Sequence, residues 1–92
     1  MALSALSKFS FDIAFLGTNG VDLKQGFTTP DIEEATLKRR AYDQANRTFI
    51  LADSTKFDAV TATSFLPFDP TLIITDSINK EKFKNLGILE AK

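Results

Sequence analysis

Three short apolar runs, each followed at once by polar residues, constrain the fold of this chain more than any other feature. They are DIAFL at residues 12–16, TFILA at 48–52 and TLIIT at 71–75. Continuous apolar runs of this length are typical of strands that are buried on both faces, as in a parallel sheet. Because a helical segment separates the first two runs, this order predicts an α/β domain with a mostly parallel sheet.

The helix between the first two strands has clear start signals. Thr29 suits the N-cap, Pro30 suits the first helical position, and acidic side chains follow where the helix dipole favours negative charge. We expect this helix to run to about Ala45. The remaining expected elements are a strand over residues 60–66, a short helix from Asp76 or Ser77 to residue 86, and an edge strand at 88–89.

The composition describes one small domain without disulfides. The chain has 92 residues, with 11 Lys and Arg, 12 Asp and Glu, a net charge of −1 and no cysteine. Because the phosphates of nucleic acids demand a basic surface, this balance argues against DNA binding by the chain itself. No apolar run approaches the roughly 20 residues of a membrane span, and the first residues lack the layout of a secretory signal. We therefore expect no membrane partner and a reducing, cytoplasmic location.

Polar residues follow all three predicted strands. Residues 17–20 (GTNG) follow the first, 53–56 (DSTK) the second and 75–76 the third. Right-handed crossovers place the carboxyl ends of parallel strands at one edge of the sheet, where open α/β sheets bind ligands. Gly17 and Gly20 allow a backbone to approach a ligand closely, but the same residues also make plain turns, and residues 75–76 also suit a helix cap.

Two charged residues fall on the apolar side of the predicted helix. Glu34 and Lys38 lie four residues apart, beside Leu37 and Ala41, and a charge on a buried face needs a partner or a purpose. One interpretation is an ion pair at the helix margin, with Lys38 reaching water on its long stem. The alternative for Glu34, which is shorter and nearer to the strand ends, is a role in a ligand site.

Asp53 and Lys56 are the more specific candidates for a ligand site. A carboxylate accepts hydrogen bonds from sugar hydroxyls and an ammonium group faces phosphate oxygens, whereas the simpler interpretation is an aspartate-initiated turn with a solvated lysine. Together with Glu34 they supply the groups that proton transfer on a sugar needs. Without His or Cys, the chain offers neither a zinc site built on those ligands nor a cysteine nucleophile, and no cofactor is expected. A binding module, an enzyme and a structural unit all stay open on these grounds.

Four segments, taken in order, resemble the distal part of the effector domain of DeoR-family bacterial transcription regulators. They are GTNGVD (17–22), GFTTPDIEEATLKR (26–39), ADSTKF (52–57) and LIITD (72–76). Within that family the chain is most similar to repressors of sugar phosphotransferase operons of the lactose or fructose type. The resemblance implies a three-layer, Rossmann-like parallel sheet flanked by helices, a fold shared with ribose-5-phosphate isomerase and glucosamine-6-phosphate deaminase.

The resemblance also implies a function without catalysis. In such regulators a phosphorylated sugar acts as inducer and weakens operator binding by a separate winged helix-turn-helix module. A fragment of an isomerase-like or deaminase-like enzyme is the alternative. Carried over by motif, the sugar-phosphate site comprises Gly17, Thr18, Asn19, Gly20, Glu34, Asp53 and Lys56.

The departures from the family pattern concern what the sequence lacks. It contains neither the DNA-binding module nor the first half of the effector domain with its phosphate loop, and residues 2–11 fit the helix that leads into the second half. Residues 1–92 are therefore expected to form a single partial domain, truncated or excised from a longer protein. Sheet edges that the absent half would cover are free to pair with another copy, so a homo-oligomer is expected.

Overall fold

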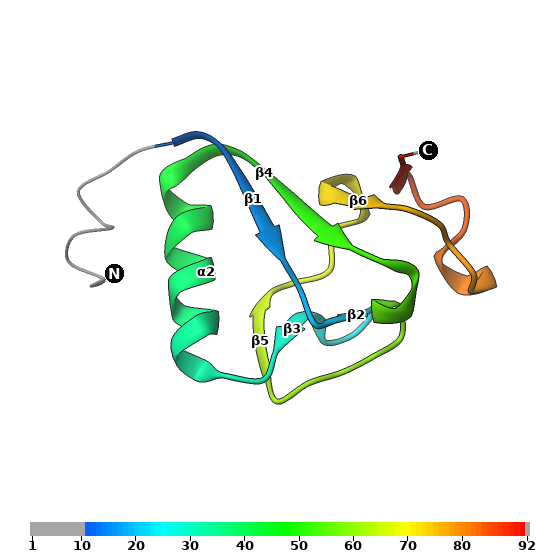
Figure 1. Cartoon of the computed structure of the whole chain (residues 1–92), viewed down its shortest axis with the longest axis horizontal. Coiled ribbons are helices and arrows are strands. Elements are labelled where there is room, and N and C mark those ends of the chain that lie inside the picture. Colours follow the sequence, from blue (N-terminus) through cyan, green and yellow to red (C-terminus); the bar gives the residue numbers. More distant parts are fainter. Residues whose placement is uncertain (1–10, 92) are drawn as a thin grey trace.

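Two sheets and one α-helix make up the part of the chain that the computed structural model describes, residues 11–91 (Figure 1). The helix expected at residues 2–11 lies outside this part, apart from Phe11, which belongs to a strand. The strands are β1 (Phe11–Gly17), β2 (Gly20–Asp22), β3 (Gly26–Thr29), β4 (Ala45–Ala52), β5 (Thr63–Leu66), β6 (Ile73–Thr75) and β7 (Leu89–Glu90). The helix is α2 (Ile32–Gln44), and the single 3-10 turns are η1 (Ser54–Lys56), η2 (Pro70–Leu72) and η3 (Glu81–Phe83).

Four strands form a parallel sheet in the order β1-β4-β6-β7. β1 pairs with β4 so that Gly17 lies opposite Leu51, and β4 pairs with β6 so that Ala52 lies opposite Thr75. The prediction of an α/β fold with a mostly parallel sheet is confirmed, and every predicted strand of this sheet is present.

A β-hairpin that was not predicted follows β1. β2 and β3 pair in antiparallel fashion, and β5, in the second half of the predicted 60–66 strand, pairs with β3. The Asp22 carboxylate closes the hairpin turn by accepting hydrogen bonds from the N–H groups of Lys24 and Gln25, at 2.9 and 2.8 Å. Gly26 then adopts a φ of 80°, a conformation that favours glycine.

α2 begins later than predicted. Thr29 is buried as the last residue of β3, so its prediction as the N-cap is wrong. Pairing with β5 keeps Thr29 extended, and Pro30 separates the strand from the helix. Asp31 is the cap, and its Oδ1 accepts a hydrogen bond from the Glu33 N–H at 3.0 Å. At its other end α2 leads directly into β4.

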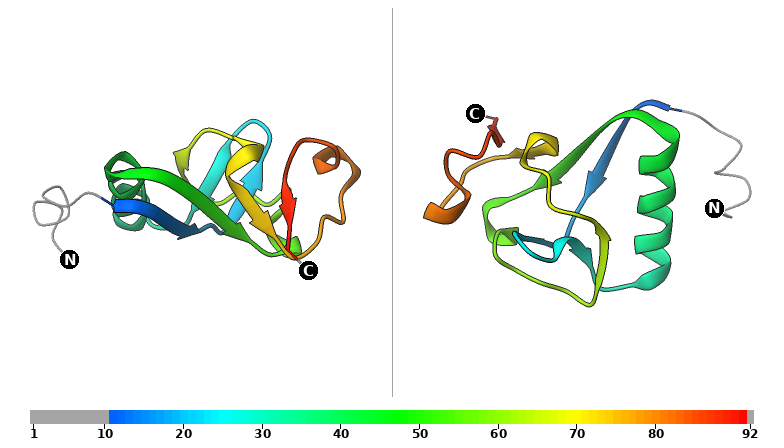
Figure 2. Two further views of the ribbon diagram at one scale, coloured as in Figure 1. Left: turned by 90° about the horizontal axis from the view of Figure 1, so that it is seen from above. Right: turned by 180° about the vertical axis from the view of Figure 1, so that it is seen from behind.

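The core lies between one face of the parallel sheet and a layer formed by α2 and the antiparallel sheet (Figure 2). Thr48, Ile50 and Ala52 of β4 are buried on this side. Phe57 and Phe83, from segments far apart in the sequence, meet here with their ring centroids 5.0 Å apart. Such aromatic contacts join the loop after β4 to the segment before β7.

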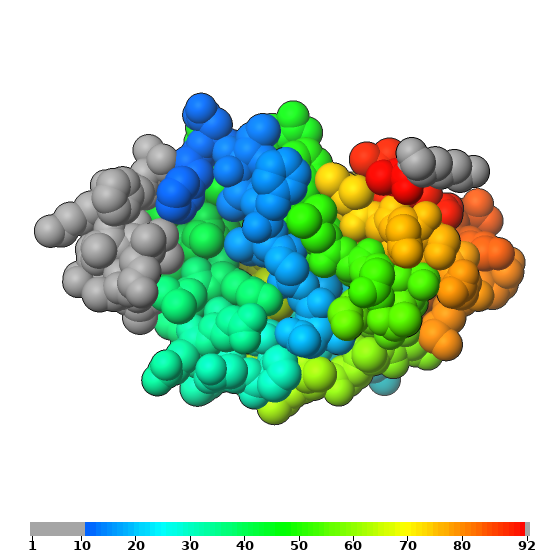
Figure 3. All heavy atoms as spheres, viewed as in Figure 1, coloured from blue at the N-terminus to red at the C-terminus, as the bar shows by residue number. Residues whose placement is uncertain are grey.

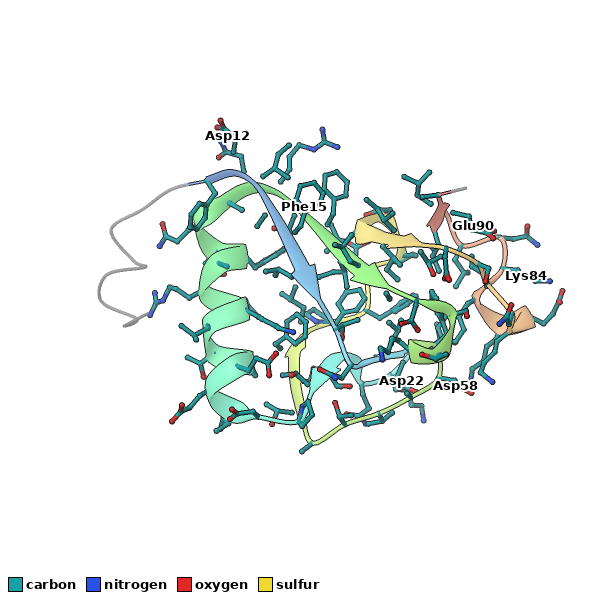
Figure 4. The ribbon with its side chains drawn as sticks, in the orientation of Figure 1. Asp12, Phe15, Asp22, Asp58, Lys84 and Glu90 are labelled. Carbon is teal, nitrogen blue, oxygen red and sulfur yellow. The ribbon has the colours of Figure 1, made fainter. Side chains whose placement is uncertain are left out.

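The opposite face of the parallel sheet is uncovered within residues 11–91 (Figures 3 and 4). Phe15 is 60% exposed and stacks on Phe49 at 5.6 Å between centroids, while Ile13, Leu51 and Leu89 are exposed beside them. The prediction that the first strand is buried on both faces is therefore wrong, because β1 is an edge strand covered on one face only. Residues 11–91 form two layers, whereas the predicted fold has three, with helices on both faces of the parallel sheet.

Residues 77–86 do not form the predicted helix. η3 contributes a single turn whose Phe83 is fully buried, and Asn85 adopts a φ of 62°. Because Phe83 is the only buried residue in this segment, no apolar stripe holds a longer helix against the core. β7 follows as the predicted edge strand.

Candidate functional site

The carboxyl ends of β1, β4 and β6 lie side by side at one edge of the parallel sheet, as predicted (Figure 1). Gly17 ends β1 beside Leu51, and Thr75 ends β6 beside Ala52. Since strands lie about 4.8 Å apart and rise about 3.3 Å per residue, the Cα atoms of Gly17 and Asp53 are on the order of 8 Å apart. The polar segments after the three strands therefore share this edge.

Thr18 and Gly20 are buried and serve the hairpin itself. The Thr18 hydroxyl lies within donating distance of two carbonyl oxygens, 2.8 Å from that of Gly20 and 3.0 Å from that of Thr28. A Cβ on Gly20 would lie 2.3 Å from the carbonyl oxygen of Ala59, so only glycine fits there. These two predicted site residues shape the edge, and neither presents a side chain to a ligand in this structure.

Gly17 and Asn19 are exposed at the same edge. The Gly17 carbonyl oxygen accepts a hydrogen bond from the Lys38 ammonium at 2.6 Å. The Asn19 side-chain oxygen accepts one from the Thr29 hydroxyl at 3.2 Å. The Asn19 amide NH2 has no hydrogen-bond partner among the described residues, so it offers two N–H donors to solvent or a ligand.

Glu34 is tied to the end of β1 through Lys38. Its Oε1 lies 3.3 Å from the Lys38 Nζ, so the two residues form the ion pair that their spacing suggested. Lys38 does not extend freely along the helix margin, because its ammonium donates a hydrogen bond to the exposed Gly17 carbonyl at the end of β1. Glu34 and Gly17, two predicted site residues from different elements, thus lie within reach of one cation.

Asp53 caps η1 and stays exposed. Its carboxylate accepts hydrogen bonds from the Thr55 hydroxyl and from the Thr55 N–H, the latter at 2.9 Å. These two hydrogen bonds, in that order, and then the Lys56 charge at 4.0 Å, lower the pKa of Asp53 below its ordinary value of 3.8. This is the aspartate-initiated turn of the simpler interpretation, and it leaves an ionised carboxylate at the sheet edge.

Asp76 lies at the same edge, as its position after the third predicted strand indicated, although it was not among the predicted site residues because it also suits a helix cap. Its Oδ1 accepts hydrogen bonds from the N–H groups of Ser54 and Ser77, at 3.0 and 2.8 Å, and so joins the end of β6 to η1. An open depression of about 360 Å³ lies here, with two carboxylates as its charged groups. It is lined by Leu51, Ala52, Asp53, Ile74, Thr75, Asp76 and Ala91.

Neither a metal-ligand cluster nor a membrane-crossing helix occurs in residues 11–91. No three His, Cys, Asp or Glu side chains gather there as metal ligands would. No helix in that range combines the length and the apolar character that crossing a membrane requires.

A family model described as the DeoR C-terminal sensor domain matches residues 1–77, well over half of the chain. The chain belongs to this family. The resemblance to DeoR-type regulators that the four segments indicated is thereby confirmed.

Curated relatives of this sensor domain are transcriptional regulators. The chain is 42% identical over 84 residues to the uncharacterized HTH-type transcriptional regulator FruR of Bacillus subtilis (strain 168), covering 91% of the chain and 34% of the relative. It is 30% identical over 92 residues to the HTH-type transcriptional regulator GlpR of Haloferax volcanii, covering 95% of the chain and 36% of the relative. Over 57 residues it is 39% identical to the putative aga operon transcriptional repressor of Escherichia coli O157:H7, covering 62% of the chain and 21% of the relative. The chain spans about a third or less of the length of these relatives.

Proposed function

We propose that this chain is the part of a bacterial transcriptional repressor that binds a phosphorylated sugar, the inducer of a sugar-utilisation operon. The observation that carries the proposal is the meeting of three polar strand ends at one edge of the parallel sheet. Carboxylates there can accept hydrogen bonds from sugar hydroxyls, and amide and ammonium groups can donate to phosphate oxygens. The proposed contacts are Gly17, Asn19, Glu34, Asp53, Lys56 and Asp76, with Thr18 and Gly20 shaping the edge.

Membership of the sensor family supports a regulatory role rather than a catalytic one. The relatives carry the names of transcriptional regulators, and one is named as the putative repressor of an operon. With a net charge of −1 the chain has no excess of basic residues for operator DNA. We therefore place DNA binding in a helix-turn-helix module outside these residues, and the protein in the cytoplasm, where the operator is.

Self-association is part of the proposal. β1 and β7 are the edge strands of the parallel sheet, and one face of that sheet is apolar and uncovered within residues 11–91. Free strand edges and apolar faces are the surfaces through which copies of a chain pair. A homo-oligomer is therefore proposed for the working regulator.

Ligand binding is tested by calorimetry and thermal shift with a set of hexose and pentose phosphates, on the protein at its natural length. A ligand at about 100 times its Kd stabilises the folded state by about 2.7 kcal/mol, which is a readily measured rise in Tm. Asp53→Asn is expected to abolish the rise, while Asp43→Asn, which alters an exposed carboxylate on α2, leaves it intact. A set of sugar phosphates that leaves the Tm of the unaltered protein unchanged would contradict the proposal.

A coupled assay for isomerase and deaminase activity separates a sensor from a related enzyme. The expected result is binding without turnover for every sugar phosphate in the set. Turnover that disappears in Asp53→Asn would assign the chain to the enzymes instead.

A further inference from the structure

α2 forms one flank of the described part of the chain, and its outer side is exposed (Figure 1). Glu33, Thr36 and Arg40 lie on that side, at spacings of three and four residues that put them on one helix face. Ile32 lies beside them and is 69% exposed, more than any other large apolar side chain in residues 11–91. Within that range, this face of α2 is therefore free to meet a partner.

A groove of about 440 Å³ follows the same side, between α2 and β5. The buried Ala35 and Phe65 contribute to its lining, and so do the exposed Ile32 and Arg40. The surface thus carries an apolar projection and a recess next to each other. Two-fold interfaces between identical chains need a patch that is complementary to itself, and a projection beside a recess meets this requirement.

The charges on this face are also separated along the helix. Glu33 lies in the first turn, whereas Arg39 and Arg40 lie in the middle of α2 and its last turn has no basic residue, so the helix dipole does not account for the arginines. Arg39 pairs with Asp43 at 3.3 Å, but no ion pair within residues 11–91 involves Arg40. Glu33 and Arg40 are about 10.5 Å apart along the helix axis, too far to pair with each other.

We propose that two copies of the chain pair through this face, with their α2 helices antiparallel about a two-fold axis close to Thr36. Glu33 lies three residues before Thr36 and Arg40 four residues after it, so each Glu33 lies opposite Arg40 of the second copy. Ile32 of each copy then contacts the aliphatic stems of Arg39 and Arg40 in the groove of the other. This inference rests on the homo-oligomer of the proposed function, adds a contact distinct from the edges at β1 and β7, and does not depend on the sugar phosphate.

Sedimentation velocity on the protein at its natural length, over a range of concentrations, tests the paired charges. Arg40→Glu and Glu33→Arg are each expected to raise the Kd of self-association by about ten- to thirtyfold, because two symmetry-related exposed pairs change from attraction to repulsion. The double variant exchanges the opposed charges and is expected to restore association, which a folding defect in either single variant would not allow. Lys24→Glu, the same charge reversal at the exposed hairpin turn, is the matched control and leaves the Kd unchanged.

A cysteine close to the proposed axis reports this contact even where other surfaces also hold copies together. Residues 1–92 contain no cysteine, so any cysteines elsewhere in the protein are first replaced by serine. Thr36→Cys is expected to form a disulfide-linked dimer with oxidised glutathione, because antiparallel helices packed 8–10 Å apart bring facing Cα atoms within disulfide range. Asp43→Cys, about 10.5 Å further along the helix, is the control and stays unlinked.

Each outcome bears on a different claim. If the unaltered protein is a monomer at every concentration, the proposed homo-oligomer fails and takes this inference with it. If the unaltered protein associates but Thr36→Cys links no better than Asp43→Cys, or the double charge variant is no better than the single ones, this inference is overturned and association through other surfaces stands. Selective linkage at Thr36 together with restoration in the double variant supports the antiparallel pairing.

Discussion

Replacing each glycine of the GTNG segment by alanine is expected to have opposite effects on the stability of the fold. A Cβ on Gly20 would lie 2.3 Å from the Ala59 carbonyl oxygen and 2.5 Å from the Thr28 Oγ1, so either the backbone of the loop or β3 would have to move. A Cβ on Gly17 would meet nothing within 4 Å, and Gly17 has no positive φ. Gly20→Ala is thus a steric insertion, and Gly17→Ala is its matched control.

The expected size of each effect follows from these contacts. Forcing an extra methyl into a packed site costs about 1–3 kcal/mol. At a compatible exposed position, Gly→Ala stabilises by about 0.4–1 kcal/mol, because the unfolded chain has fewer conformations to lose. In a domain of this size 1 kcal/mol corresponds to roughly 4–8 °C in Tm, so Gly20→Ala lowers the Tm and Gly17→Ala raises it slightly.

Thermal unfolding followed by circular dichroism, with urea unfolding as a check on two-state behaviour, measures both variants. Two results would refute the reasoning. If Gly20→Ala melts at the Tm of the unaltered chain, then β2 does not approach the segment around Ala59 as closely as described. If Gly17→Ala destabilises as much as Gly20→Ala, the exposed end of β1 is packed against something that the described residues do not include.

Two further predictions concern the side chains that cap the short elements. Thr55→Val removes the hydroxyl that lowers the pKa of Asp53, so that pKa should rise toward 3.8, measured by NMR titration. Because a lowered carboxyl pKa stabilises the fold above pH 3.8 and this contribution is lost as the pH falls through the folded-state pKa, the variant should also show a smaller loss of stability in acid. Asp31→Ala removes the N-cap of α2 and should cost about 0.5–2 kcal/mol in urea unfolding, whereas Asp31→Asn, which can still accept the Glu33 N–H, should cost much less.

The long-range features of the fold could be predicted because they depend on where apolar residues cluster along the chain. Continuous apolar runs identified the strands of the parallel sheet, and the handedness of crossovers placed their carboxyl ends at one edge. β2 and β3 were missed because their sequences, GVD and GFTT, are short and contain no run of apolar residues. The available signal was Asp22 four residues before Gly26, an aspartate turn followed by a glycine with positive φ.

The short helix expected over residues 77–86 shows the limit of local signals. Capping residues at its start and Gly87 at its end match a helix, but only Phe83 supplies a buried side chain between them. Local signals were also insufficient at the candidate functional site. The helical spacing placed Lys38 on the apolar side of α2, but the direction of the Lys38 side chain depends on the Gly17 carbonyl, 21 residues away. The burial of Thr18 likewise depends on the hairpin that was not predicted.

The aromatic side of the parallel sheet has a practical consequence for ligand titrations. Phe15, Phe49 and Leu51 meet solvent in the described structure, and attraction between such surfaces strengthens in sulfate and phosphate salts and weakens on cooling. A sugar phosphate added in large excess can therefore tighten contacts between chains without occupying any site. Sodium sulfate at equal ionic strength, titrated in the cold, separates this solvent effect from recognition of the ligand.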